Sequence, residues 1–132
     1  MNVLVTGARG FIGRNLTAHL QVRTCCVVTQ FDDDNSKDDL RRGLETADIV
    51  YHLAGVNRPR NTEEFEIGNA GLTRAICDNL RELSRTPVIV MPSSVQAALE
   101  NPYGVSKRHA EDTLREAGYE LEFEQFNALK TK

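Results

Sequence analysis

A tyrosine and a lysine stand four residues apart in the segment Tyr103-Gly104-Val105-Ser106-Lys107. In a helix this spacing places both side chains on one face. A phenol has a pKa of about 10 and is a poor acid or base at neutral pH unless its anion is stabilised, which a neighbouring ammonium group can do. The pair therefore predicts acid/base catalysis with Tyr103 as the proton carrier. The competing interpretation is that both residues belong to an ordinary helix surface.

Two serines precede this pair. Ser93 and Ser94 follow the apolar run 88–91, which is predicted to be a strand. Ligands of open α/β sheets bind at the carboxyl ends of the strands. Either serine is therefore a candidate for holding a substrate carbonyl or alcohol group.

A glycine-rich string, TGARGFIG at residues 6–13, follows the first apolar run and opens a helical pattern. Gly7 permits a tight turn, Gly10 lets the backbone approach a pyrophosphate, and Gly13 lets the helix pack closely against the strand. The free amide groups at the start of the helix favour an anion. The strand–turn–helix context predicts a dinucleotide-binding loop, against the alternative of a glycine-rich turn without a ligand.

Short apolar runs alternate with longer stretches of helical periodicity along the chain. The predicted strands are 3–5, 25–28, 49–53 and 88–91, with 121–126 as a candidate fifth, and the predicted helices are 11–20, 40–44, 63–83 and 103–117. Strict alternation implies right-handed βαβ units. The apolar runs suit strands that helices cover on both faces. We therefore expect the α/β class, with a Rossmann-type doubly wound parallel sheet.

Composition excludes several classes. The 132 residues carry a formal net charge of −3, so the chain lacks the basic excess of a nucleic-acid-binding protein. No apolar run reaches the roughly 20 residues of a membrane span, and the amino terminus does not resemble a signal peptide. Three histidines and three cysteines lack the spacing of metal ligands. We expect one cytoplasmic Rossmann domain over residues 1–132, with no metal.

The spacing of the three loop glycines resembles the short-chain dehydrogenase/reductase superfamily, and the string TGAxGFIG resembles its extended branch, the NAD-dependent epimerase/dehydratase family. His52-Leu53-Ala54-Gly55 is similar to the His-Leu-Ala-Ala stretch of that family, whose backbone lines the cofactor. Asn69-Ala70-Gly71 is similar to its Asn-Val-x-Gly-Thr segment, with Leu72 in place of the threonine.

The resemblance implies roles for individual residues. Tyr103 would be the acid/base, and Lys107 would orient the cofactor ribose and stabilise the phenolate. Ser94 aligns best with the catalytic serine or threonine, ahead of Ser93. The implied cofactor-binding residues are Gly7, Arg9, Gly10, Phe11, Ile12, Gly13, Asp32, Leu53, Ala54, Gly55, Asn69, Tyr103 and Lys107.

A narrower resemblance links residues 1 to about 120 with the reductase domain of two-domain enzymes of capsular and lipopolysaccharide biosynthesis. It rests mainly on the stretch 52–59 and on the short loop from Ser93 to Tyr103. In that group a cupin domain epimerises C3 of a 4-keto UDP-sugar, and the amino-terminal domain reduces C4 with NADPH. The resemblance implies a sugar-nucleotide reductase of capsular or O-antigen polysaccharide biosynthesis.

The choice between NAD(H) and NADP(H) depends on opposing signals. Asp32 lies 19 residues after Gly13, near the position of an acid that binds the ribose of NAD. Arg9 and Arg14 favour a 2′-phosphate. The resemblance tips the prediction slightly to NADP(H), while a plain solvated loop is the alternative for the acidic run 32–34.

After Phe126 the pattern of the family is lost, so we expect a fragment without a substrate-binding lobe. Whether such a chain is an enzyme is open: the alternative is an inactive dinucleotide-binding module. A UDP-sugar is the expected substrate only if the lobe is present. An uncovered sheet edge and two long helices lead us to expect a homodimer or larger oligomer.

Overall fold

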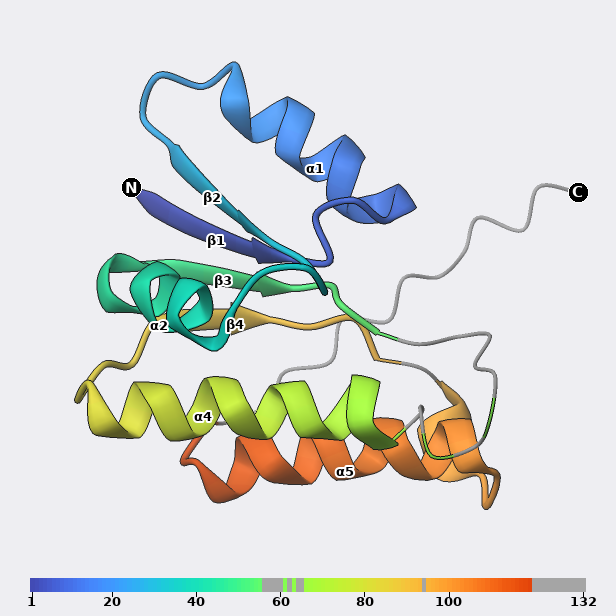
Figure 1. The fold of residues 1–132 in the computed structure, drawn as a ribbon. Coiled ribbons are helices and arrows are strands. Elements are labelled where there is room, and N and C mark those ends of the chain that lie inside the picture. The colour runs from blue at the N-terminus through green and yellow to red at the C-terminus, as the bar shows by residue number, and fades with distance from the viewer. Residues whose placement is uncertain (56–60, 62, 64–65, 94, 120–132) are drawn as a thin grey trace, which may run out of the picture.

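The computed structural model describes residues 1–55, 61, 63, 66–93 and 95–119. Its strands form one parallel sheet in the order β2-β1-β3-β4. Their bounds are Asn2–Thr6 for β1, Val27–Phe31 for β2, Ile49–His52 for β3 and Val88–Val90 for β4. Helices lie on both sides of the sheet (Figure 1). The predicted Rossmann-type, doubly wound parallel sheet is thereby confirmed.

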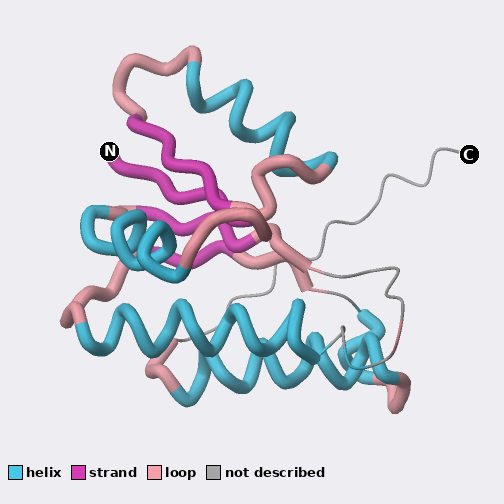
Figure 2. The backbone as a smooth tube through the Cα atoms, viewed as in Figure 1, coloured by secondary structure: helices cyan, strands magenta, loops and turns pink. Residues whose placement is uncertain are grey.

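The helices form two unequal layers. Helix α1, Phe11–Gln21, contacts β1 and β2 on one face of the sheet, while α2, Lys37–Thr46, and α4, Leu72–Glu82, cover the other face. Helix α5, Pro102–Glu116, packs against α4 and against the π-helical turn η1, Glu66–Gly71. Figure 2 shows α4 and α5 running side by side below the strands. A short 3₁₀ turn, Val95–Ala98, precedes α5.

The core is split by the sheet into two clusters. On the side of α2 and α4, Leu4 and Val50 of the sheet pack with Leu44 and Ile76 of the helices, and each is at most 1% exposed. On the side of α1, Val3 and Val5 of β1 are buried against partly buried residues that include Leu16 and Leu20. Successive residues of β1 therefore point to opposite layers, which explains its continuous apolar run.

Several predicted boundaries differ from the structure. Strand β2 begins at Val27 rather than at residue 25, because a turn closes before it, with the Cys26 amide donating to the Arg23 carbonyl at 3.2 Å. The predicted helix 63–83 is represented among the described residues by the turn η1 and α4. The predicted short helix 40–44 extends over Lys37–Thr46, because Ser36 and Asp39 form a capping box at its start. The candidate strand 121–126 lies outside the described residues.

Strand β4 was expected to be covered on both faces, and this expectation is wrong. Ile89 packs against the α2 and α4 side, but Val88 is 61% and Val90 is 42% exposed. The reason is that α1 lies over β1 and β2, so that the described elements leave this face of β4 uncovered. Within the described residues, no helix has the length and apolar character needed to cross a membrane.

Candidate active site

The glycine loop joins the end of β1 to the start of α1. Gly7 has a φ of +67°, and its amide donates to the Phe31 carbonyl at 2.9 Å. A Cβ at Gly7 would lie 2.7 Å from the backbone of Ala54, so both the dihedral angle and the close approach require glycine. This contact brings the loop against the segment that follows β3.

Gly13 and Gly10 serve different purposes. A Cβ on Gly13 would lie 2.1 Å from the Gly7 carbonyl oxygen, so glycine is needed for the first turn of α1 to pack on the loop. A Cβ on Gly10 would meet the Gly7 carbonyl oxygen at 3.3 Å, and Gly10 itself is exposed. Space therefore remains outside Gly10, at the amino terminus of α1, where unpaired amides favour a phosphate. Phe11 and Ile12 are 85% and 58% exposed beside it.

Arg9 is paired with the acidic residues that follow β2. Its backbone amide donates to Asp32 at 3.3 Å, and its Nε lies 3.4 Å from the same carboxylate. Its Nη2 donates to Asp34 at 2.6 Å. The side chain of Asp32 is only 15% exposed, whereas that of Arg9 is 61% exposed. A partly buried carboxylate and an exposed guanidinium group therefore lie together beside the glycine loop.

The segment after β3 connects this loop to α5. The amides of Leu53 and Ala54 donate to the carbonyl and hydroxyl oxygens of Thr6, at 3.1 Å and 3.3 Å. A Cβ on Gly55 would lie 2.9 Å from Asn69 Oδ1 and 3.3 Å from Lys107 Nζ. The backbone at Gly55 therefore runs directly beside a polar residue of η1 and the lysine of α5.

A buried polar chain runs through His52. The Thr73 hydroxyl donates to the Asn69 carbonyl at 2.8 Å, so it accepts from His52 Nε2 at 2.9 Å. His52 Nδ1 then accepts from the Thr6 hydroxyl at 2.7 Å. This pattern requires the neutral ring protonated at Nε2. Burial and, to a smaller extent, the positive charge of Lys107 together lower the pKa of His52 to about 4.

The Tyr103–Lys107 pair occupies the first turns of α5. Lys107 Nζ lies 5.7 Å from the centre of the Tyr103 ring, and Lys107 is 8% exposed. Burial lowers the pKa of Lys107, whereas the charge of Glu111 raises it. The Asn69 amide donates to Ser106 Oγ at 3.0 Å, and Ser106 Oγ donates to the Tyr103 carbonyl at 2.8 Å. Residue Asn69 of η1 therefore fixes the turn that carries the tyrosine.

These contacts bring most of the predicted site residues together at the carboxyl ends of the strands. The glycine loop, the 53–55 segment, Asn69 and the Tyr103–Lys107 pair follow one another in contact. Ser94 lies outside the described residues. Ser93 donates its hydroxyl proton to Glu111 Oε1.

Sequence reasoning missed five polar residues that are buried among these elements: Thr6, His52, Thr73, Ser106 and Glu111. Two of them carried a signal. His52 ends an apolar strand, where a polar residue needs a partner if it is buried. Glu111 follows Lys107 by one helical turn and therefore lies on the Tyr103–Lys107 face of α5.

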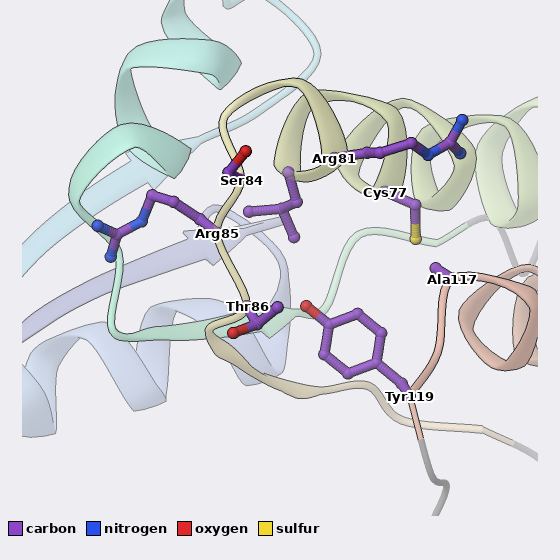
Figure 3. A pocket seen from close by; sticks show the side chains of 8 residues that line it. Cys77, Arg81, Ser84, Arg85, Thr86, Ala117 and Tyr119 are labelled. Atoms are coloured by element: carbon purple, nitrogen blue, oxygen red, sulfur yellow. The ribbon is translucent and has the colours of Figure 1, made fainter.

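A separate cavity of about 210 Å³ lies at the other end of the sheet, near the amino end of β4. It is formed by the last turns of α4 and α5 and the loop before β4. Its lining residues are Cys77, Leu80, Arg81, Ser84, Arg85, Thr86, Ala117 and Tyr119 (Figure 3). Burial raises the pKa of the Cys77 thiol to about 11, so this thiol is protonated at neutral pH. The cavity is remote from the glycine loop, which lies at the carboxyl end of β1.

Comparisons with known proteins agree with this arrangement. Residues 3–124 match the sequence profile of the NAD dependent epimerase/dehydratase family. UDP-2-acetamido-2,6-beta-L-arabino-hexul-4-ose reductase from Pseudomonas aeruginosa is 46% identical over 121 residues, which cover 92% of this chain and 32% of the relative. The chain therefore spans about a third of the length of this curated relative.

Solved structures give the same result. The capsular polysaccharide assembling protein CapF from Staphylococcus aureus has a TM-score of 0.74 and 40% identity, over 89% of this chain and 32% of CapF. A UDP-glucuronic acid 4-epimerase from Bacillus cereus has a TM-score of 0.75 at 20% identity, over 89% of this chain and 52% of that one, and shows the likeness of fold alone. The predicted resemblances are confirmed, and this chain belongs to the NAD dependent epimerase/dehydratase family.

Proposed function

We propose that this chain is the dinucleotide-binding part of a reductase that acts on C4 of a 4-keto UDP-N-acetyl sugar, in the biosynthesis of a capsular or O-antigen polysaccharide. One observation carries the proposal: a series of close approaches leads from the glycine loop, residues 6–13, to the Tyr103–Lys107 pair. The backbone of Gly7 leaves no room for a Cβ beside Ala54, the backbone of Gly55 leaves little room for one beside Lys107, and Lys107 lies beside Tyr103. The 46% identity with the Pseudomonas aeruginosa reductase supports the choice of substrate class.

The residues present fit a nicotinamide dinucleotide. The open space at Gly10 and the amino terminus of α1 would hold the pyrophosphate, and Asp32 would lie near the adenosine ribose. Lys107, held beside Gly55, would contact the ribose of the nicotinamide. The backbone of the 53–55 segment would line the cofactor between these points.

The proposed chemistry divides two tasks. When bound, the reduced nicotinamide supplies a hydride to the carbonyl carbon. The Tyr103 hydroxyl donates a proton to the carbonyl oxygen, so that the ketone becomes an alcohol and Tyr103 becomes a phenolate. The Lys107 ammonium stabilises that phenolate through its position on the same helix face. Ser94 would hold the same substrate oxygen with a hydrogen bond.

The preference between NAD(H) and NADP(H) depends on the charged cluster of Arg9, Asp32 and Asp34. NADP(H) remains our prediction, supported by the resemblance and by the exposed guanidinium group of Arg9. Asp32, whose carboxylate lies beside Arg9, would favour the free ribose hydroxyl of NAD(H). Arg9→Gln should therefore weaken the binding of NADPH more than that of NADH. Asp32→Asn should weaken the binding of NADH more than that of NADPH.

A titration with NADH and NADPH, followed by calorimetry, tests the cofactor proposal. Gly10→Ala should weaken binding and Gly10→Val should weaken it further, because each side chain would enter the space left for the phosphate. Gly10 has an ordinary backbone dihedral, φ −69°, so that both variants should retain the wild-type circular dichroism spectrum. Absence of binding of either cofactor to the wild type at millimolar concentration would contradict the proposal.

The same proteins test the chemistry with a 4-keto UDP-N-acetyl sugar as substrate. Tyr103→Phe should abolish consumption of the reduced cofactor. The affinity of this variant for the cofactor should stay nearly unchanged, because the ring and its contact with Lys107 remain. Lys107→Ala should reduce both the consumption of the cofactor and the affinity for it. Tight cofactor binding without consumption above the Tyr103→Phe background would instead identify this chain as a dinucleotide-binding module without catalysis.

A further inference from the structure

Glu111 is a buried carboxylate for which the proposed chemistry has no role. It follows Lys107 by four residues and Tyr103 by eight on α5, so the three side chains lie along one face of that helix. Glu111 is 7% exposed and Lys107 is 8% exposed. A buried charge is costly unless other groups pair with it or donate hydrogen bonds to it.

The carboxylate of Glu111 is held from two directions. The Ser93 hydroxyl, from the segment that follows β4, donates to Oε1. Arg115 Nη2, one helical turn further on, lies 3.8 Å from Oε2. The Ser93 contact comes from outside the helix, so the position of the carboxylate depends on how α5 lies against the segment that follows β4.

Among the described residues, the titratable groups that face Lys107 come from two elements. His52 on β3 interacts with Lys107, and its pKa of about 4 makes it neutral throughout the alkaline range. Tyr103 and Glu111 lie on α5 itself. Burial lowers the pKa of Lys107 and the negative charge of Glu111 raises it, so Glu111 opposes the effect of burial.

We propose that Glu111 is a positioning residue that acts through Lys107, as the buried counter-charge that keeps the Lys107 ammonium protonated where it would bind the cofactor ribose. The role toward the ribose rests on the proposed function, whereas the electrostatic effect of Glu111 on Lys107 does not. The Ser93 hydroxyl donates to this carboxylate, but the charge that acts on Lys107 is that of Glu111 itself.

The chain has four lysines, Lys37, Lys107, Lys130 and Lys132, so a sample labelled at the lysine Cε carbon gives a simple NMR spectrum. Lys107→Arg assigns the signal. Glu111→Gln and Glu111→Ala should lower the titration midpoint of Lys107 by about one pH unit, because an anion near a partly buried cation is lost. Glu111→Asp and Ser93→Ala, which retain the negative charge, should keep the midpoint within about 0.3 of a unit.

The dissociation constant of NADPH or NADH, measured across the same pH range, tests the role toward the cofactor. The alkaline loss of affinity should move to lower pH in Glu111→Gln by the same amount as the Lys107 midpoint. If the Lys107 midpoint is unchanged in both neutral variants, the effect of Glu111 on Lys107 is overturned. If the midpoint shifts but the pH profile of cofactor affinity does not, the role of Glu111 in cofactor binding is overturned. If the midpoint shifts but the wild type binds no cofactor, the effect on Lys107 is supported and the proposed function is overturned.

Discussion

At the scale of single residues, His52 links the glycine loop to η1 through two threonine hydroxyls. Because every proton in this series of hydrogen bonds is already assigned, a second proton on the ring would end the donor role of the Thr6 hydroxyl toward Nδ1. Burial, together with the charge of Lys107, lowers the pKa of His52 to about 4 and keeps the ring neutral at neutral pH. A neutral histidine is therefore a condition for the arrangement of the candidate site.

Stability should depend on pH through His52. An unfolded histidine has a pKa of about 6.5, so as the pH falls the unfolded state binds this proton before the folded state does. The stabilising contribution is complete above that value and decreases as the pH falls toward 4, by about 3 kcal/mol in total. Urea unfolding at a series of pH values measures it.

His52→Gln should lower the free energy of unfolding at neutral pH and flatten its decrease between pH 6.5 and 4 relative to the wild type. His19→Gln is the matched control, because His19 is an exposed histidine on α1. An equal acid-induced loss of stability in the wild type and in His52→Gln would show that His52 is not the group responsible.

At the scale of elements, the start of α5 decides where Tyr103 lies. Asn101 caps this helix, with its side chain accepting from the Gly104 amide at 2.7 Å, and Pro102 occupies the first turn. On the other side, Asn69 of η1 reaches the same turn through Ser106. A π-helical turn often marks a functional site, and here it supplies that contact.

Asn101→Ala should cost about 1 kcal/mol of unfolding free energy, while Asn101→Asp, which can still accept the hydrogen bond, should cost less. Ser36→Ala is the control, because Ser36 caps α2, which carries no candidate site residue. Both alanine variants should lose similar stability, but only Asn101→Ala should weaken cofactor binding. Equal effects of the two on cofactor affinity would argue against a role of the α5 cap in the site.

At the scale of the whole molecule, β4 ends the described sheet with one face uncovered. Val88 and Val90 are 61% and 42% exposed and therefore present apolar surface. They lie on β4, which has one edge without a partner strand among the described elements. Such surfaces favour association. We therefore predict that this chain forms a homodimer or larger oligomer.

Sedimentation velocity at micromolar concentration measures this association. The double variant Val88→Thr, Val90→Thr should shift the protein toward the monomer, because it removes apolar contact area but keeps residues that favour strands. Val22→Thr is the control, since Val22 is 80% exposed at the end of α1, away from β4. A wild-type protein that sediments as a single monomeric species would contradict the prediction.

Features that depend on local chemistry could be predicted from the amino-acid sequence. The glycine spacing of residues 6–13 specified a loop in which Gly7 and Gly13 have no room for a side chain, and the apolar runs specified strands, of which β4 is covered on one face only among the described elements. The spacing of Tyr103 and Lys107 placed both on one helix face. These signals extend over one turn or one strand, so the fold class and the family could be predicted, although the boundaries of β2 and α2 could not.

Which polar groups meet depends on the packing of elements that lie far apart in the chain. His52 and Thr73 are 21 residues apart, Asn69 and Ser106 are 37 apart, and Ser93 and Glu111 are 18 apart. Each pair joins different elements, so its contact depends on how those elements pack and not on a periodicity within either one. The exposure of β4 was decided in the same way, because a strand is covered or uncovered by the helices that cross its faces. Packing between distant elements therefore assigned partners to His52 and Glu111.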